Sequence, residues 1–363
     1  MNAIVSGTSF PAIRGTQAGK EYYTIMCPLK RLKKIFTFDE SGLMPEDRAQ
    51  RTLVPSRIPQ IAGYINDNRD SYTFSSLTAC IDGDCHFKPI GNAGHDQKIG
   101  TLTVDEDAEF YITDGQHRSA AINKALEEDP SLANETISVV FFINKTLKER
   151  QKVFRDLNLY PIKPSHSLSI RFGDTPPEKL TNAVADKSDF FNGVISFEDI
   201  NLGTRSTKLF KNSSLYAANQ KLMPKVTEEN LESTIKLALE YWNTVAKNLT
   251  VWQLAKSNDI PPIERQEFVN FSAIVLKCFG MIGYELLNNH KNWKTILKKL
   301  QTIDWRRSNK QNWEGRCINQ SRMDHSNYAA TLTVNTIKKH LNLPLTEKEQ
   351  TEENKLAEVK RGN

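Results

Sequence analysis

A short polar segment in the first half of the chain carries the residues best suited to chemistry. The segment Asp114–Arg118 reads Asp-Gly-Gln-His-Arg and joins a strand-like run to a helix-like run. N–H groups at a helix start point outward unpaired, and the helix dipole favours negative charge there. We expect Asp114 to cap the helix and Gly115 to admit a ligand close to the backbone. Arg118 then faces an anion, for which a phosphate is well suited.

The same five residues also have an ordinary structural interpretation. A capped helix whose arginine forms a surface salt bridge would show this spacing, and a lone glycine beside polar residues is a weak signal. His117 by itself is more often structural than catalytic. If the turn performs chemistry, Asp114 and His117 are the candidate catalytic residues, because hydrolysis needs a base or a metal to position water. The acidic stretch Asp105–Glu109 lies close in sequence.

Elements of both kinds surround this turn. Apolar residues at Ile58, Ile61, Ala62 and Ile65 follow helical spacing, and Thr146 with Glu149 forms a capping box. Asp82-Gly83 is a strong signal for a two-residue hairpin. Further expected elements are a short helix over 28–36 and strands over 21–26, 72–81, 102–104, 110–113 and 137–143. Residues 1–165 are therefore predicted to form a mixed α/β domain.

The second half changes to long amphipathic segments. Helices are expected over 228–246, 264–287, 293–303 and 332–341. Residues 166–345 are thus predicted to be a helical domain, and residues 346–363 a frayed, charged tail. The predicted fold class is α+β, with a mixed α/β domain followed by an all-α C-terminal domain.

Two clusters of cations are candidates for DNA contact. The first combines Lys30, Arg31, Lys33 and Lys34 within five residues. The second combines Arg306, Arg307, Lys310 and Arg316 with two interleaved tryptophans, Trp305 and Trp313. Cations beside aromatic rings suit backbone phosphates and exposed bases. A solvated basic face is the alternative for both, since the net charge of +5 permits nucleic-acid binding without requiring it.

Composition excludes several other classes. The longest apolar run near the middle, Val139–Ile143, is far too short for a membrane span, and no secretion signal is visible, so we expect a cytoplasmic protein. Five cysteines in a long chain do not suggest a disulfide framework. Cys80, Cys85 and His86 lack a second pair at zinc spacing, so no metal site and no zinc are expected. No Walker A loop or dinucleotide fingerprint is present.

The segment Asp114–Arg118 resembles the signature of DGQHR-domain proteins, which belong to the ParB/sulfiredoxin-like fold group. Val153–Asn158, then Lys163–Ser165 with Ser167-Leu168, resembles the stretch that follows this signature, and Arg57–Ile65 resembles the helix before it. The resemblance implies a ParB/sulfiredoxin-like N-terminal domain. It also implies a nucleotide ligand, ATP or another nucleotide with Mg²⁺, held by Gly115, Gln116 and Arg118.

The C-terminal half resembles the DndB family of DNA sulfur modification proteins. The matching segments are Asn312–Arg316 and Leu332–Lys338. The resemblance implies a DNA-binding negative regulator of the phosphorothioate modification genes. Implied partners are double-stranded DNA, other DNA sulfur modification proteins and a second copy of the chain. An ATPase or a DNA-nicking enzyme of the ParB-like nuclease kind, acting at the signature turn, remains the alternative.

Overall fold

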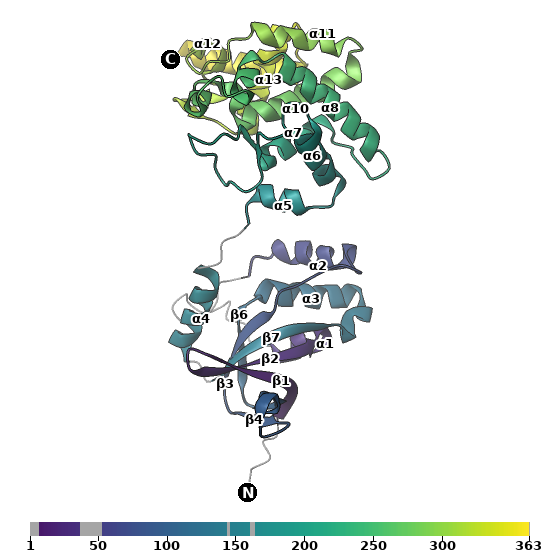
Figure 1. Cartoon of the computed structure of the whole chain (residues 1–363), viewed down its shortest axis with the longest axis vertical. Coiled ribbons are helices and arrows are strands. Elements are labelled where there is room, and N and C mark those ends of the chain that lie inside the picture. Colours follow the sequence, from purple (N-terminus) through teal and green to yellow (C-terminus); the bar gives the residue numbers. More distant parts are fainter. Residues whose placement is uncertain (1–6, 37–52, 144–145, 160–163, 363) are drawn as a thin grey trace. The chain divides into compact units, whose positions relative to one another are not determined.

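A computed structural model of the chain describes residues 7–36, 53–143, 146–159 and 164–362. The chain divides into two compact units, residues 1–162 and residues 163–363. Each unit has its own buried apolar cluster. Figure 1 labels the elements of both units.

A seven-stranded sheet forms the centre of the N-terminal unit, in the order β4-β5-β1-β2-β7-β3-β6. The strands are β1 (Gly7–Gln17), β2 (Lys20–Pro28), β3 (Leu77–Asp82), β4 (Cys85–Pro89), β5 (Ile99–Asp105), β6 (Glu109–Asp114) and β7 (Thr136–Ile143). Neighbours pair antiparallel except β3 and β7, which run parallel. As predicted, the strand near 137–143 is central, lying between β2 and β3.

The predicted hairpin at Asp82-Gly83 is wrong. β4 pairs with β5 at one end of the strand order, whereas β3 pairs with β6 at the other. β3 and β4 therefore follow each other as one long bent strand, and β5 and β6 form a second long strand that pairs with it. At the bend, the Asp105 N–H donates to the Asp84 carbonyl, 3.0 Å away. Gly83 has a φ of 145°, and an added Cβ would lie 2.5 Å from Ala108 Cβ, so only glycine fits this corner.

Helices of the N-terminal unit occupy the segments in which local sequence signals predict them. They are α1 (Leu29–Ile35), α2 (Arg57–Asp67), α3 (Gln116–Glu128) and α4 (Leu147–Leu159). α2 buries Ala62 and Ile65, which belong to the predicted apolar face. The Thr146 capping box opens α4, with the Thr146 N–H donating to Glu149 Oε2 at 3.1 Å. α3 contacts both α1 and α2 (Figure 1).

The C-terminal unit is mainly helical. Its helices are α5 (His166–Phe172), α6 (Pro176–Lys187), α7 (Asn212–Leu222), α8 (Leu231–Lys247), α9 (Thr250–Lys256), α10 (Ala273–Asn289), α11 (Trp293–Leu297), α12 (Lys310–Trp313), α13 (Asn327–Leu341) and α14 (Glu347–Gly362). Two short strand pairs, Ile195–Ser196 with Phe210–Lys211 and Ile318–Asn319 with Arg322–Met323, accompany them. The helix predicted over 264–287 starts only at Ala273, because Ser272 caps it and accepts from the Val275 N–H.

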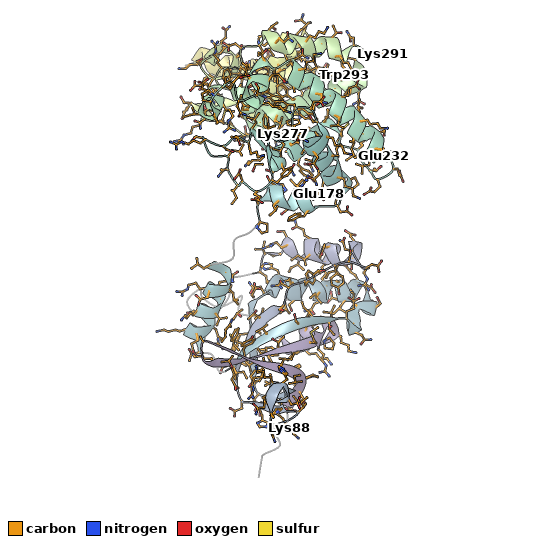
Figure 2. The ribbon with its side chains drawn as sticks, viewed as in Figure 1. Lys88, Glu178, Glu232, Lys277, Lys291 and Trp293 are labelled. Carbon is orange, nitrogen blue, oxygen red and sulfur yellow. The ribbon has the colours of Figure 1, made fainter. Side chains whose placement is uncertain are left out.

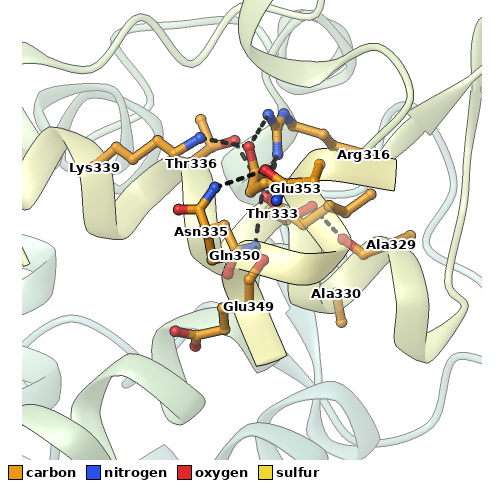
Figure 3. A network of polar contacts seen from close by, with 12 residues as sticks. Arg316, Ala329, Ala330, Thr333, Asn335, Thr336, Lys339, Glu349, Gln350 and Glu353 are labelled. Carbon is orange, nitrogen blue, oxygen red and sulfur yellow. Dashed lines mark hydrogen bonds and ion pairs between the residues drawn. The ribbon is translucent and has the colours of Figure 1, made fainter. Parts of the chain in front are cut away.

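The predicted frayed tail is instead the helix α14. Its Leu356 is 8% exposed and its Glu353 is 8% exposed. Glu353 accepts from Arg316 Nη1 at 2.5 Å, and Lys339 of α13 pairs with the same carboxylate (Figure 3). The absence of apolar periodicity was misleading, because charged contacts rather than an apolar stripe hold much of this helix.

Candidate functional site

The signature turn places Gly115, not Asp114, at the N-cap of α3. Gly115 has a φ of 96°, and an added Cβ would lie 2.4 Å from Leu77 Cδ2. The left-handed backbone and this close approach both require glycine. No side chain caps the helix. The predicted Asp114 cap is therefore wrong.

The Asp114 carboxylate forms an ion pair with Arg118 instead of capping the helix. Arg118 Nη2 lies 2.5 Å from Asp114 Oδ2. Arg118 Nη1 donates to the Ser75 carbonyl at 2.5 Å, the Ser75 hydroxyl at 2.5 Å and the Ser76 carbonyl at 3.0 Å. The guanidinium thus ties the start of α3 to the segment that enters β3. Its unfavourable place near the positive end of the helix dipole is balanced internally.

His117 also has a structural contact. It is 7% exposed, and its Nε2 accepts from the Val54 N–H at 2.8 Å. An accepting Nε2 places the ring proton on Nδ1. His117 therefore anchors the backbone that leads into α2. The sequence did not indicate Ser75, Ser76 or Val54 as partners, because they lie 43, 42 and 63 positions from the residues that they contact. The available signal was the polar pair Ser75-Ser76 directly before an apolar strand.

The first basic cluster covers the solvent side of α1. Leu29 and Leu32 are buried, whereas the four cations are exposed. Lys30 Nζ donates to Asn134 Oδ1 at 2.8 Å, and Lys33 Nζ lies 3.3 Å from Glu127 Oε1. Arg31 and Lys34 have no ion-pair partner among the described residues. These two cations are the available charges of the cluster.

A cleft of about 820 Å³ runs beside α1. Lys30, Arg31 and Lys34 line it from the helix, and Asp105, Glu106 and Glu109 line it from the turn between β5 and β6. The acidic stretch noted in the sequence thus faces the first basic cluster rather than the signature turn. Within the described ranges, no three His, Cys, Asp or Glu side chains gather in a group that could hold a metal ion.

The two tryptophans of the second basic segment are not available to bases. Trp305 is 6% exposed and Trp313 is 0% exposed, and their rings stack 5.3 Å apart. Their indole N–H groups donate to backbone carbonyls of Leu300 and Asp304. The predicted aromatic contribution to DNA contact is therefore wrong. The pair is part of the core and supports the turn that carries the cations.

Arg316 belongs to the interior as well. Its guanidinium donates to the Leu332 carbonyl at 2.8 Å and forms a two-pronged pair with Glu353 (Figure 3). Burial alone would raise the pKa of Glu353, but Arg316 and Lys339 outweigh it and hold that pKa at about 2. These internal contacts occupy the Arg316 guanidinium, so we no longer count Arg316 among the residues expected to contact DNA.

Arg306, Arg307 and Lys310 remain as a surface group, which we call the 306–310 cations. Arg306 and Lys310 are exposed and Arg307 is partly exposed. A backbone bridge joins Arg306 to Phe268, and the Arg307 N–H donates to the Glu267 carbonyl at 2.8 Å. Among the described residues, no carboxylate lies within ion-pair distance of these three side chains. They are held on a fixed backbone without internal neutralisation.

A family model named DndB, described as DNA-sulfur modification-associated, matches residues 10–344 of the chain. No curated protein matches, and no solved structure matches. The ParB/sulfiredoxin-like assignment of the N-terminal unit therefore stays a prediction. None of the helices in the described part of the chain has the length and apolar character needed to cross a membrane.

Proposed function

Because the chain belongs to the DndB family, we propose that it is a DNA-binding negative regulator of the phosphorothioate modification genes. The family implies involvement in DNA sulfur modification. Double-stranded DNA is the proposed partner, so the proposed location is the cytoplasm, where that DNA lies. Other proteins of the modification system and a second copy of the chain are further proposed partners.

The 306–310 cations are the observation that supports DNA contact most directly. Phosphate contacts dominate the affinity of proteins for DNA and require cations that are not already neutralised. Other lysines at the surface of the unit, such as the half-buried Lys179 and the exposed Lys294, pair with carboxylates. The 306–310 cations have no such partner among the described residues, and their backbone is fixed by the bridge to Phe268. Arg31 and Lys34 of α1 form a second, smaller candidate contact.

Salt dependence tests this contact quantitatively. Each phosphate neutralised on duplex DNA contributes about 0.9 to the slope of log affinity against log salt. Replacing Arg306, Arg307 and Lys310 together by Ala should therefore reduce the slope by roughly 2 to 3. Fluorescence anisotropy with a labelled duplex, from low to high salt, measures both affinity and slope.

A matched control separates local contact from overall charge. Lys225, Lys236 and Lys291 lie in the same unit and are exposed, and Lys291 is labelled in Figure 2. Their triple Ala variant removes the same charge and should leave the slope nearly unchanged. Equal effects of the two triple variants, or no effect of the first, would remove the 306–310 cations from the contact.

Regulation requires sequence discrimination. A repressor must prefer its operator to bulk DNA by about a thousandfold or more. We expect tight binding to a short site upstream of the chain's own operon and much weaker binding to a scrambled duplex of equal length. Equal affinity for both, with metal-dependent nicking that is lost in Asp114→Ala or His117→Ala, would support an enzyme instead.

Nucleotide binding at the signature turn is a separate proposal. It is supported by Gly115 at the N-cap of α3, where the left-handed backbone leads into the helix without a capping side chain. The internal contacts of Arg118 reduce what that side chain can offer a phosphate. Backbone N–H groups would therefore carry most of the contact.

A further inference from the structure

A small pocket in the C-terminal unit brings two arginines together. It has a volume of about 150 Å³ and is lined by Arg265 and Arg307, by the polar residues Thr204, Gln266 and Ser272, and by the apolar residues Leu209, Phe268 and Phe271. Arg265 played no part in the sequence-based predictions. The pocket can hold a group of a few heavy atoms but no nucleobase with its sugar.

Arg265 is a buried cation without a carboxylate. It is 8% exposed, and burial lowers its pKa. Its Nε donates to the Pro262 carbonyl at 2.8 Å and its Nη2 to the Gly203 carbonyl at 3.3 Å, while Nη1 donates to the Lys208 carbonyl. A guanidinium has five N–H donors, so these bonds leave two unused. Carbonyl dipoles solvate the charge, but no described residue neutralises it.

Arg307 supplies a second positive charge. Its backbone is fixed by the bond to the Glu267 carbonyl. Its Nε is buried and has no hydrogen-bond partner among the described residues. The guanidinium is partly exposed and makes no hydrogen bond or ion pair to a described residue, so its donors are available to an acceptor bound in the pocket.

The start of α10 adds to the positive potential of the pocket. Ser272 lines the pocket and caps α10, a helix of 17 residues. The dipole of a helix presents positive potential at its N-terminus. Two guanidinium groups and a helix start thus lie around one small cavity, and its lining contains no Asp or Glu.

We infer that this pocket binds a phosphate group. A tetrahedral oxyanion fits its size, offers acceptors to Arg265 and Arg307, and neutralises the cations. The group can come from free phosphate or from the backbone of DNA, since Arg307 also belongs to the 306–310 cations. The pocket goes beyond the proposed regulatory function and does not depend on it.

Calorimetric titration of the full chain with inorganic phosphate, in a chloride buffer, tests the pocket. Wild type should show saturable binding at one site. Arg307→Gln should weaken that binding at least about tenfold, because it removes a charge-assisted contact. Arg306→Gln is the matched control: Arg306 is the exposed neighbour, does not line this pocket, and should bind phosphate like wild type.

Arg265→Gln provides a second variant, whose fold is checked by tryptophan fluorescence. If it is folded, it should also lose phosphate binding. Absence of saturable binding by wild type would overturn the pocket. Equal losses in Arg306→Gln and Arg307→Gln would do the same, because they would indicate a general charge effect.

Duplex DNA distinguishes the two sources of the group. If saturating duplex abolishes phosphate binding, the pocket holds a backbone phosphate. If phosphate still binds, the pocket holds a free or small-molecule phosphate. A double variant, Arg306→Ala with Lys310→Ala, tests the proposed function separately, because it leaves Arg307 and the pocket intact. If this variant keeps the wild-type salt slope of DNA binding, the proposed DNA contact fails while the phosphate pocket is unaffected.

Discussion

Replacing Arg118 by Ala should destabilise the N-terminal unit. If the signature arginine existed only to hold a ligand, its removal would leave the fold unchanged. The structure instead shows Arg118 bonded to Ser75, Ser76 and Asp114. Its side chain is only 17% exposed, so water replaces these bonds incompletely in the variant.

The magnitude follows from those contacts. A hydrogen bond to a charged group contributes roughly 1.5–3 kcal/mol, and an exposed ion pair contributes about 1 kcal/mol or less. Since Ser75 is exposed, part of the loss is recovered from water. We expect the free energy of unfolding of this unit to fall by about 2–4 kcal/mol. Asp114→Ala removes the ion pair alone and should cost less than about 1 kcal/mol.

Lys124 on the same helix gives a matched control. It pairs with Glu128 at i and i+4, 3.3 Å apart, and both side chains are more than 40% exposed. Lys124→Ala should change the free energy of unfolding by about 0.5 kcal/mol or less.

Hydrogen exchange provides the assay for this unit. All five tryptophans lie in the C-terminal unit, so their fluorescence reports that unit and should not change. Exchange at the amides of β3 and β6 reports the N-terminal unit and should accelerate. If Arg118→Ala is as well protected from exchange as Lys124→Ala, the bonds from Arg118 to Ser75 and Ser76 do not stabilise the unit. The guanidinium would then be better explained by ligand binding.

Two further predictions concern α14 and the signature turn. Because the pKa of Glu353 is about 2 rather than the ordinary 4.5, its stabilisation is complete above pH 4.5 and lost as pH falls toward 2. Urea unfolding followed by tryptophan fluorescence should show a loss of about 1–3 kcal/mol over that range, and Glu353→Gln should remove this dependence. Calorimetry with ATP, ADP and CTP tests nucleotide binding at the signature turn, and Gly115→Ala should abolish any binding that wild type shows. If wild type shows no binding heat with any of the three, the nucleotide proposal is contradicted.

Local signals predicted much of the N-terminal unit. The helix at Arg57–Asp67 and the capping box at Thr146 depend on residues within a few positions of each other, and both were found. The hairpin at Asp82-Gly83 failed because strand pairing is decided by long-range neighbours, here Tyr111 for Cys80 and Val104 for Cys85. Turn residues alone cannot distinguish a hairpin from a bend in a continuous ribbon.

The candidate site was less predictable than the fold. A basic segment with tryptophans has the same sequence whether its rings face solvent or stack in the core, as Trp305 and Trp313 do. Arg118 and its partner Ser75 are separated by 43 positions, so their contact has no local signature. Arg265 and Arg307 likewise meet only through the fold.

The position of β7 has a consequence for synthesis of the chain. β7 is the last strand of the sheet to leave the ribosome, yet it lies between β2 and β3. Until it emerges, the edges of β2 and β3 that β7 will join are unpaired, and open strand edges are templates for pairing with other chains. A series of stalled chains ending before and after β7 would show whether protease resistance appears in one step. The order of translation thus makes one late segment the closing element of the whole N-terminal sheet.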